Sequence, residues 1–235
     1  MATKLSADEV SRYQKDGVVA PVSVMSPAVA NELRFRLESA EKLFPHQIGP
    51  EKRNNAHYVL RCLDEIVHHD EILDAVECLI GPDIILTNTV LFIKEPNSLH
   101  HVTYHQDATY MGLEPQDSLT AWIALTESTP ENGCVRMIQG SHLLDIQQHI
   151  DTFGEDNILT RGQQIENIDE ERVLDIELEP GQMSLHHART IHGSRPNKTA
   201  ARRIGIALQS FARPSTRQVH GEDYALLVRG SDGYG

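Results

Sequence analysis

The sequence predicts a mainly β protein with helices in its N-terminal part, an α+β arrangement. Up to about residue 82, apolar residues recur at helical spacing between helix-capping signals. From about residue 83 to 213, short apolar runs alternate with turn residues, which is typical of a β-sandwich or barrel. Residues 143–172 interrupt this alternation with polar and charged side chains, and we interpret them as a partly helical insertion. Because no repeat, low-complexity tract or linker divides the chain, we expect residues 1–235 to form one domain.

Three helices are expected in the N-terminal part. Ser6 and Glu9 form a capping-box pattern at the start of the first helix, and Pro27 is a favoured residue in the first turn of the second. Gly17 and Gly81 are typical stop signals. The expected helices cover about residues 6–17, 26–45 and 70–80, with a short strand at 18–22. The second helix is expected to bury five apolar positions, namely Val29, Leu33, Leu37, Ala40 and Phe44.

Seven apolar runs after residue 83 are the candidate strands. Turn signals rich in proline and glycine lie between them, as at Glu179-Pro180-Gly181-Gln182. The runs cover residues 84–93, 102–105, 119–125, 135–138, 173–178, 183–187 and 204–211.

The charge balance narrows the class of function. The chain has 34 acidic and 21 basic residues and a formal net charge of −13, which argues against a nucleic-acid binder, since such a protein needs a basic face. No apolar run approaches the roughly 18–20 residues of a membrane span. The widely spaced Cys62, Cys78 and Cys134 indicate reduced thiols rather than a disulfide framework or a zinc cluster. We therefore expect a cytoplasmic protein that acts on a small molecule.

The segment Tyr104-His105-Gln106-Asp107 is the sharpest chemical signal. In a strand, side chains at positions i and i+2 point to the same face, so His105 and Asp107 should converge. An imidazole and a carboxylate placed in this way are two members of a 2-His-1-carboxylate facial triad, the ligand set of many non-haem Fe(II) oxygenases. An H-x-D sequence alone is common, so the prediction depends on a third ligand elsewhere in the chain.

The third ligand is sought in the segment that contains His186, His187 and His192. Periodicity does not choose among them, because a bend after His187 would reset the faces, and His186 and His187 could equally be core residues. Downstream, strand alternation places Arg203 on a face with otherwise small residues, which is unusual for a core and suited to a pocket. Its planar guanidinium matches a carboxylate with two parallel hydrogen bonds.

Taken together, the motifs resemble those of the phytanoyl-CoA dioxygenase family. The resemblance covers about residues 84–211 and rests on motifs in a fixed order. These are Tyr104-His105-Gln106-Asp107, Ala121-Trp122-Ile123-Ala124-Leu125, Glu131-Asn132-Gly133-Cys134, Ile138-Gln139-Gly140-Ser141-His142, Pro180-Gly181, His186-His187, His192-Gly193-Ser194, Pro196-Asn197 and Arg202-Arg203. The resemblance implies a double-stranded β-helix core (a jelly-roll, cupin-like fold). It also implies an oxidoreductase that uses Fe(II), 2-oxoglutarate and O₂.

The resemblance also assigns roles to residues. It implies that His105, Asp107 and His192 are the catalytic iron ligands. It implies that Arg203 grips the far carboxylate of 2-oxoglutarate, with further contacts to the cosubstrate from Ser194, Trp122 and Asn88 or Val90. Related halogenases lack the carboxylate ligand. With Asp107 present, the expected reaction is hydroxylation, or another oxidation, with release of succinate and CO₂.

Substrate contacts are expected from residues close in sequence to the ligands. The candidates are Thr103, Tyr104, Thr109, Tyr110, Arg189, Arg195 and Arg213. If one or two of these arginines face the cavity, the small-molecule substrate is expected to be anionic.

Two other functions are kept open. One is a cupin-like metal enzyme that does not use 2-oxoglutarate, such as a zinc- or iron-dependent isomerase or hydrolase. The other is a non-catalytic binding protein on the same fold. Arg203 favours the oxygenase over the first, because a metal site without 2-oxoglutarate has no need of it. The complete ligand set argues against the second.

Overall fold

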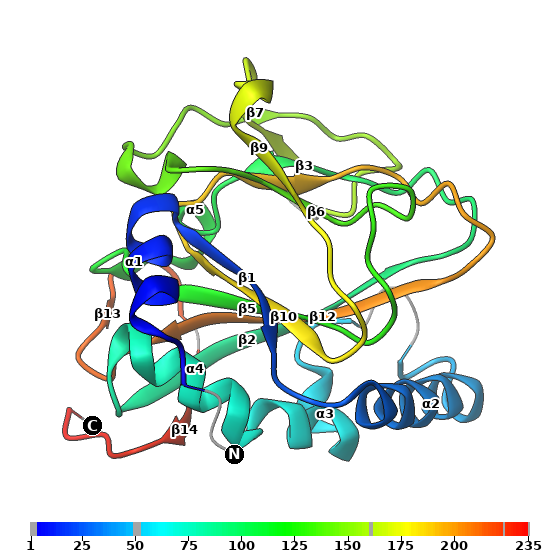
Figure 1. Ribbon diagram of the computed structural model, residues 1–235, viewed down its shortest axis with the longest axis horizontal. Coiled ribbons are helices and arrows are strands. Elements are labelled where there is room, and N and C mark those ends of the chain that lie inside the picture. The colour runs from blue at the N-terminus through cyan, green and yellow to red at the C-terminus, as the bar shows by residue number, and fades with distance from the viewer. Residues whose placement is uncertain (1–3, 49–52, 160–161, 223, 235) are drawn as a thin grey trace.

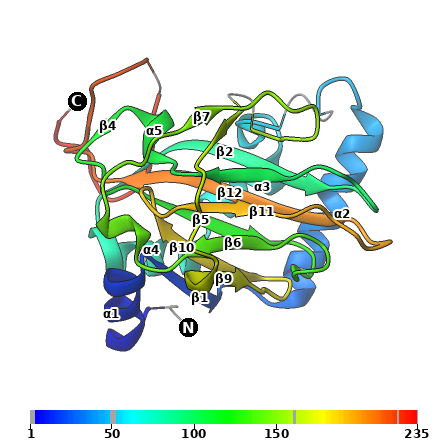
Figure 2. The same ribbon diagram turned by 90° about the horizontal axis from the view of Figure 1, so that it is seen from above.

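Two antiparallel sheets face each other in the computed structural model, which describes residues 4–48, 53–159, 162–222 and 224–234. In Figure 1 the smaller sheet lies above the larger one. The larger sheet contains, in spatial order, β1 (Val18–Ser23), β10 (Gln182–His187), β5 (Leu119–Ala124), β12 (Arg203–Ala212), β2 (Ile84–Lys94) and β14 (Leu226–Arg229). The smaller sheet contains β3 (Val102–His105), β11 (His192–Ser194), β6 (Val135–Ile138) and β9 (Val173–Ile176), which lie side by side in Figure 2. The expected jelly-roll core is confirmed.

The three expected N-terminal helices begin and end where their local signals predict. Helix α1 (Ala7–Asp16) has the reciprocal Ser6–Glu9 capping box and ends at Gly17, whose φ of 76° is left-handed. Helix α2 (Pro27–Leu43) is capped by Ser26. Helix α4 (Asp70–Ile80) ends at Gly81, as predicted. Among the described helices, none combines the length and apolar character needed to cross a bilayer.

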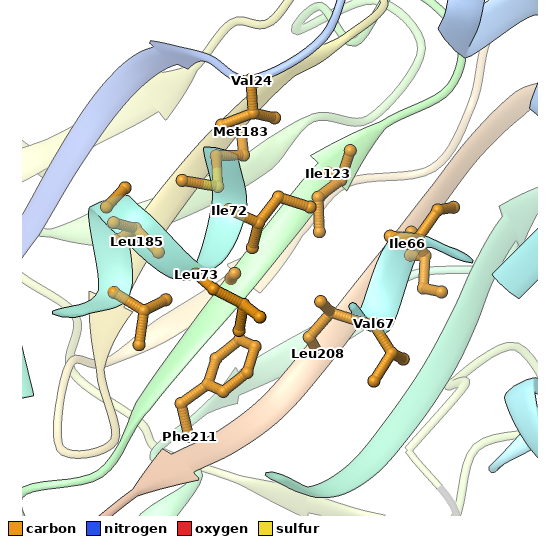
Figure 3. Close-up of a cluster of buried hydrophobic side chains, with 14 of the residues drawn as sticks. Val24, Ile66, Val67, Ile72, Leu73, Ile123, Met183, Leu185, Leu208 and Phe211 are labelled. Atoms are coloured by element: carbon orange, nitrogen blue, oxygen red, sulfur yellow. The ribbon is translucent and has the colours of Figure 1, made fainter. Parts of the chain in front are cut away.

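Helices α3 (Arg61–Val67) and α4 cover the outer face of the larger sheet. In Figure 3, Ile66 and Val67 of α3 and Ile72 and Leu73 of α4 lie against the sheet. The strand residues that they meet are Ile123, Met183, Leu185, Leu208 and Phe211. This layer covers one face of the sheet and leaves the other face to the smaller sheet, where the polar residues gather.

Helix α2 buries only part of the expected apolar stripe: of the five expected positions, Leu33 and Leu37 are buried. Its buried residues are Ala30, Leu33 and Leu37, whereas Val29 and Phe44 are 44% and 52% exposed. The prediction took every apolar residue at helical spacing as buried. In the structure, burial is limited to the narrow side of α2 that packs toward α3. Helix α3 and the short 3-10 helix η1 (Ala56–Tyr58) were not expected from the sequence. Neither has a side-chain cap at its start.

The polar insertion contains little helix among its described residues. The short strands β7 (Ile150–Asp151) and β8 (Gln163–Gln164) pair with each other, and two 3-10 turns, η2 (Ser141–Leu143) and η3 (Glu170–Arg172), flank them. The insertion is bonded to β3: Ile165 N donates to Tyr104 O at 2.7 Å and Thr103 Oγ1 donates to Gln163 O at 2.6 Å. A second small ribbon pairs β4 (Leu113–Glu114) with β13 (Arg217–Gln218).

Candidate metal centre

Three ligand atoms converge between the sheets. Strand β3 ends at His105, and Asp107 follows at the start of the short helix α5 (Ala108–Met111). Strand β11 starts at His192, which lies directly opposite His105 in the β3–β11 register. Oδ1 of Asp107 lies 3.5 Å from Nε2 of His105 and 3.7 Å from Nε2 of His192. One ligand atom from each of the three residues lies within 4.8 Å of the others, so the group could hold a metal ion.

Asp107 reaches this position by a route that differs from the predicted one. The strand stops at His105, and Asp107 has helical dihedral angles, φ −56° and ψ −38°. The turn into α5 therefore brings the carboxylate back toward His105, where an extended strand would have done so by alternation. His105 and Asp107 meet whether the segment is an extended strand or turns into a helix, because only one residue separates them in the chain.

Backbone carbonyls orient both imidazoles. Nδ1 of His105 bonds the carbonyl of Thr103 at 2.9 Å, and Nδ1 of His192 bonds the carbonyl of Thr190 at 2.9 Å. A carbonyl only accepts, so Nδ1 carries the hydrogen in each ring and the lone pair of Nε2 faces the site. Such partners commonly fix the tautomer of metal-binding histidines.

The charge states of these residues suit a divalent cation. Asp107 is 2% exposed. Burial alone would raise the pKa of its carboxyl, but the neighbouring His192, His105 and His186 hold that pKa well below its usual range. Burial lowers the pKa of His192 to about 3. Asp107 and His192 thus supply a carboxylate and a neutral imidazole, the forms that metal ligation needs.

Thr120 is a partner of the site that the sequence reasoning missed. Its hydroxyl donates to Oδ2 of Asp107 at 2.9 Å, and its side chain is buried. Thr120 lies on β5 two residues before Trp122, so strand alternation puts both on the face that lines the site. The alternation of side chains along this strand could therefore have identified Thr120 from the sequence.

The structure separates the three candidate histidines. His192 belongs to the converging group. His186, opposite Thr120 in the β10–β5 register, is buried with Nε2 3.6 Å from Oδ2 of Asp107. It therefore lies beside the group without joining it. His187 points to the other side of β10 toward Tyr13 and His142, and burial lowers its pKa to about 4.

A small pocket extends from the metal site to Arg203. Arg203 is 1% exposed, and Nε and Nη1 of its guanidinium have no hydrogen-bond partner among the described residues. Its Cζ lies 5.1 Å from the centre of a Trp122 ring. Ser194 and Trp122, both predicted from the family resemblance, line the same pocket. A buried cation with unsatisfied donors costs free energy unless an anion binds it, so the pocket fits a carboxylate ligand.

The absence of a side chain at Gly205 leaves room for the Trp122 ring. A Cβ at Gly205 would lie 2.0 Å from Cζ2 of Trp122. Glycine at this position lets the indole lie flat against β12, where it forms one wall of the pocket.

A larger cavity of about 320 Å³ also reaches the metal site. The two spaces share His105, Asp107, Phe92 and Gln209. Asn88, expected at the cosubstrate, lines this larger cavity together with Val90, and its Nδ2 donates to Oε1 of Gln209 at 2.9 Å. The remaining lining residues are Arg53, Asn54, Leu91, Tyr110, Met111, Ile158 and Leu159.

Of the expected substrate contacts, Tyr110 lines the larger cavity and the others line neither space. Tyr104 is on the face of β3 opposite His105, where its hydroxyl accepts from Nη1 of Arg136 at 2.8 Å. Thr109 lies 3.4 Å from Nε2 of His149. Arg195 is exposed, and the carbonyl of Arg189 accepts from Gln106 at 2.8 Å. Closeness in sequence to a ligand is thus a weak guide, because alternate side chains leave a strand on opposite faces.

Thr103 and Arg213 are also held elsewhere. Thr103 bonds the insertion, as described above. Arg213 pairs with Asp117 and donates to the carbonyl of Ile80 at 3.0 Å.

Comparison with known proteins agrees with the family resemblance seen in the sequence. The family model for phytanoyl-CoA dioxygenase (PhyH) matches residues 13–205. A probable alpha-ketoglutarate-dependent hypophosphite dioxygenase of Stutzerimonas stutzeri is 28% identical over 203 residues, which are 84% of this chain and 68% of that protein. Human peroxisomal phytanoyl-CoA dioxygenase is 31% identical over 142 residues, 58% of this chain and 42% of that protein, so the match spans less than half of the human enzyme. Among solved structures, the non-heme monooxygenase ThoJ is 35% identical with a TM-score of 0.85, covering 96% of this chain and 85% of that chain.

Proposed function

The chain belongs to the phytanoyl-CoA dioxygenase family, and from this we propose that it is a non-haem Fe(II)- and 2-oxoglutarate-dependent dioxygenase. The observation that carries the proposal is the unsatisfied guanidinium of Arg203, buried in a pocket that leads to the three ligand atoms. A metal enzyme without 2-oxoglutarate would have no reason to bury a cation there. A binding protein would have no reason to keep the ligand set.

Each residue has a role in this proposal. His105, Asp107 and His192 hold the iron, and Arg203 and Ser194 hold the far carboxylate of 2-oxoglutarate. Trp122 forms the wall of the cosubstrate pocket. Bound iron and 2-oxoglutarate would supply the activation of O₂, with release of succinate and CO₂. With a carboxylate as third ligand, we expect hydroxylation or a related oxidation rather than halogenation.

The larger cavity is the proposed substrate site, since it reaches His105 and Asp107 and its lining does not include Arg203. Its lining combines the amides of Asn54, Asn88 and Gln209 with apolar side chains from Val90, Phe92, Met111, Ile158 and Leu159. We expect a small molecule of mixed polarity. An anionic group on it would meet Arg53, whose Nη2 lies 3.9 Å from Glu95 and whose Nη1 donates to Ile93 O.

The test is an anaerobic titration of the protein with Fe(II) and then with 2-oxoglutarate. A visible metal-to-ligand charge-transfer band should develop on addition of 2-oxoglutarate. The band should require much more 2-oxoglutarate in Arg203→Ala, while Fe(II) affinity changes little. Arg202→Ala is the matched control, because the neighbouring arginine pairs instead with Glu41 and Glu95 at the surface. Iron binding without a band in the wild-type protein would contradict the proposal and favour a metal enzyme of another class.

A further inference from the structure

Arg53 brings a positive charge to the wall of the larger cavity. Its side chain is 14% exposed. Among the described residues that line this cavity, Arg53 is the only arginine or lysine, and Asp107, which faces the ligand histidines, is the only carboxylate. The cavity therefore has a largely buried cation whose charge no lining carboxylate is free to balance. Burial of an uncompensated charge costs free energy, so the cavity should attract an anion.

The segment that carries Arg53 is fixed to the edge of β2. Leu91 N donates to the carbonyl of Arg53 at 3.0 Å. Asn55 N donates to the carbonyl of Thr89 at 2.7 Å, and Oδ1 of Asn55 accepts from Thr89 N at 3.0 Å. The bond to Arg53 uses its backbone and leaves its guanidinium to other partners. A charged group that is held on a sheet in this way is positioned more precisely than one on a free loop.

The guanidinium of Arg53 still has donors to offer. Its Nη1 donates to the carbonyl of Ile93 at 3.0 Å, and its Nε is buried with no hydrogen-bond partner among the described residues. Its Nη2 lies 3.9 Å from Glu95, beyond hydrogen-bond distance. Glu95 is bonded more closely to Arg202, whose Nε donates to both of its carboxylate oxygens at 3.0 and 3.1 Å. A guanidinium has five N–H donors in a planar fork that matches an oxyanion, so Arg53 has capacity for one.

We propose that Arg53 binds an anionic group of the substrate, and that the substrate is a small organic oxyanion with an apolar body. This inference rests on the proposed function above and names the substrate class of that site. The apolar body would lie against the side chains of Phe92, Met111, Ile158 and Leu159, which line the same cavity.

Arg53 also lines a second groove, which it shares with Glu41 of α2, Glu95 and Arg202. Burial lowers the pKa of Arg53, and Glu41 and Glu95 act in the opposite direction. An arginine side chain stays protonated at neutral pH under such opposing effects. The cation is therefore permanent, and Glu95 is the group with which a substrate anion would compete for it.

The experiment compares charged and uncharged probes of the same shape. Small aliphatic and aromatic carboxylates and phosphonates, each paired with an uncharged amide or ester, are added to the protein loaded with Ni(II) and 2-oxoglutarate. Some of the anions should raise the melting temperature, while their uncharged partners should not. Carboxylates and phosphonates are scored separately, which identifies the oxyanion preferred. With Fe(II) in place of Ni(II), the compounds that stimulate succinate release should come from the anions that bind.

Two variants assign the effect to Arg53. Arg53→Met should weaken binding of these anions by about 10- to 100-fold, the usual value of a hydrogen bond to a charged group. Its 2-oxoglutarate charge-transfer band should remain, because Arg203 lies in the other pocket. Arg61→Met is the matched control, since this exposed arginine pairs with Glu65 on the surface of α3. Glu95→Gln should strengthen binding of the anions, because it removes the competing carboxylate.

The outcomes separate this inference from the proposed function. Should Arg53→Met fail to fold, the charged and uncharged pairs and Glu95→Gln still decide the question. If the uncharged partners bind as well as the anions, if none of the anions binds, or if Arg53→Met binds them like the wild type, the inference is wrong. The proposed function then stands as long as the charge-transfer band develops. If 2-oxoglutarate does not bind at all, the proposed function itself is wrong.

Discussion

The two carboxylate oxygens of Asp107 are divided between Thr120 and the histidines. Thr120 donates to Oδ2 at 2.9 Å, while Oδ1 faces Nε2 of His105 and of His192. This hydrogen bond holds the carboxylate in one orientation, with a single oxygen turned toward the metal position. The threonine is on β5 of the larger sheet, so the bond also joins the two sheets at the site.

Thr120→Val tests this arrangement, because valine keeps the shape and removes the hydroxyl. Partners behind metal ligands are typically worth about 10- to 100-fold in metal affinity, so Fe(II) or Ni(II) affinity should fall by roughly that factor. Competition with a chelating dye measures it. Thr126→Val is the matched control: this buried hydroxyl accepts from Ile204 N at 2.8 Å, away from Asp107, so stability should fall and metal affinity should not. Equal metal affinities in the two variants would count against the role given to Thr120.

Removal of either of two neighbouring histidines should have different effects. His192→Ala removes a ligand atom of the converging group and should reduce metal affinity by more than about 100-fold, the upper range for residues that only support ligands. His186→Ala should leave the metal bound, because His186 lies beside Oδ2 of Asp107 and outside that group. The same dye competition distinguishes them. Similar losses in both would mean that the distal ligand is misassigned.

Gly205→Ala should narrow the cosubstrate pocket by displacing the Trp122 ring that forms its wall. The added methyl group would meet Cζ2 of Trp122 and push the indole into the pocket. Overpacking of this kind costs about 1–3 kcal/mol, so both the melting temperature and the affinity for 2-oxoglutarate should fall, with metal affinity retained. Gly154→Ala, where no heavy atom lies within 4 Å of the added carbon, is the control. A Gly205→Ala protein with unchanged 2-oxoglutarate affinity would show that the ring has room to move.

His187 should make the fold sensitive to acid. Its pKa is lowered to about 4 by burial, whereas an unfolded histidine has a pKa near 6.5. Between these values the unfolded chain binds more protons, so the free energy of unfolding falls as the pH drops from about 6.5 to 4, by up to about 3 kcal/mol from this residue. His187→Asn keeps an acceptor for the Arg189 N–H and removes the titrating group. Urea unfolding at pH 7.5, 6 and 5 should show a flatter pH dependence in the variant than in the wild type or in His46→Asn, a change at an exposed position.

The parts of the fold that the sequence predicts well are those set by neighbouring residues. Ser6, Glu9 and Gly17 act within one helix, and the limits of α1 follow from them. Helix α3 was missed because Leu60 and His68, at its two ends, give no capping signal. Its formation depends on the sheet against which Ile66 and Val67 pack.

In the site too, features set by neighbouring residues could be predicted, and features set by contacts between distant segments could not. His105 and Asp107 are close in the chain, and their convergence follows from local geometry of either kind. Periodicity left the choice between His192 and His186 open, and the family resemblance alone assigned His192. Physically the choice depends on the register of β11 on β3, a contact between segments almost ninety residues apart that no local pattern encodes. The burial of Lys94 likewise depends on its pairing with Arg203 across two strands. In the sequence alone it precedes a Glu-Pro turn like any surface lysine.

Trp122 is the single tryptophan of the chain, and it lies between Gly205, the Arg203 guanidinium and the metal position. The protein therefore has a built-in optical reporter. Ultraviolet emission comes almost wholly from the indole that any occupant of the small pocket would touch. Emission changes can follow metal and cosubstrate loading without a label and without knowledge of the substrate. A library of small molecules can then be screened for those that alter the signal of the loaded protein, before any product has been identified.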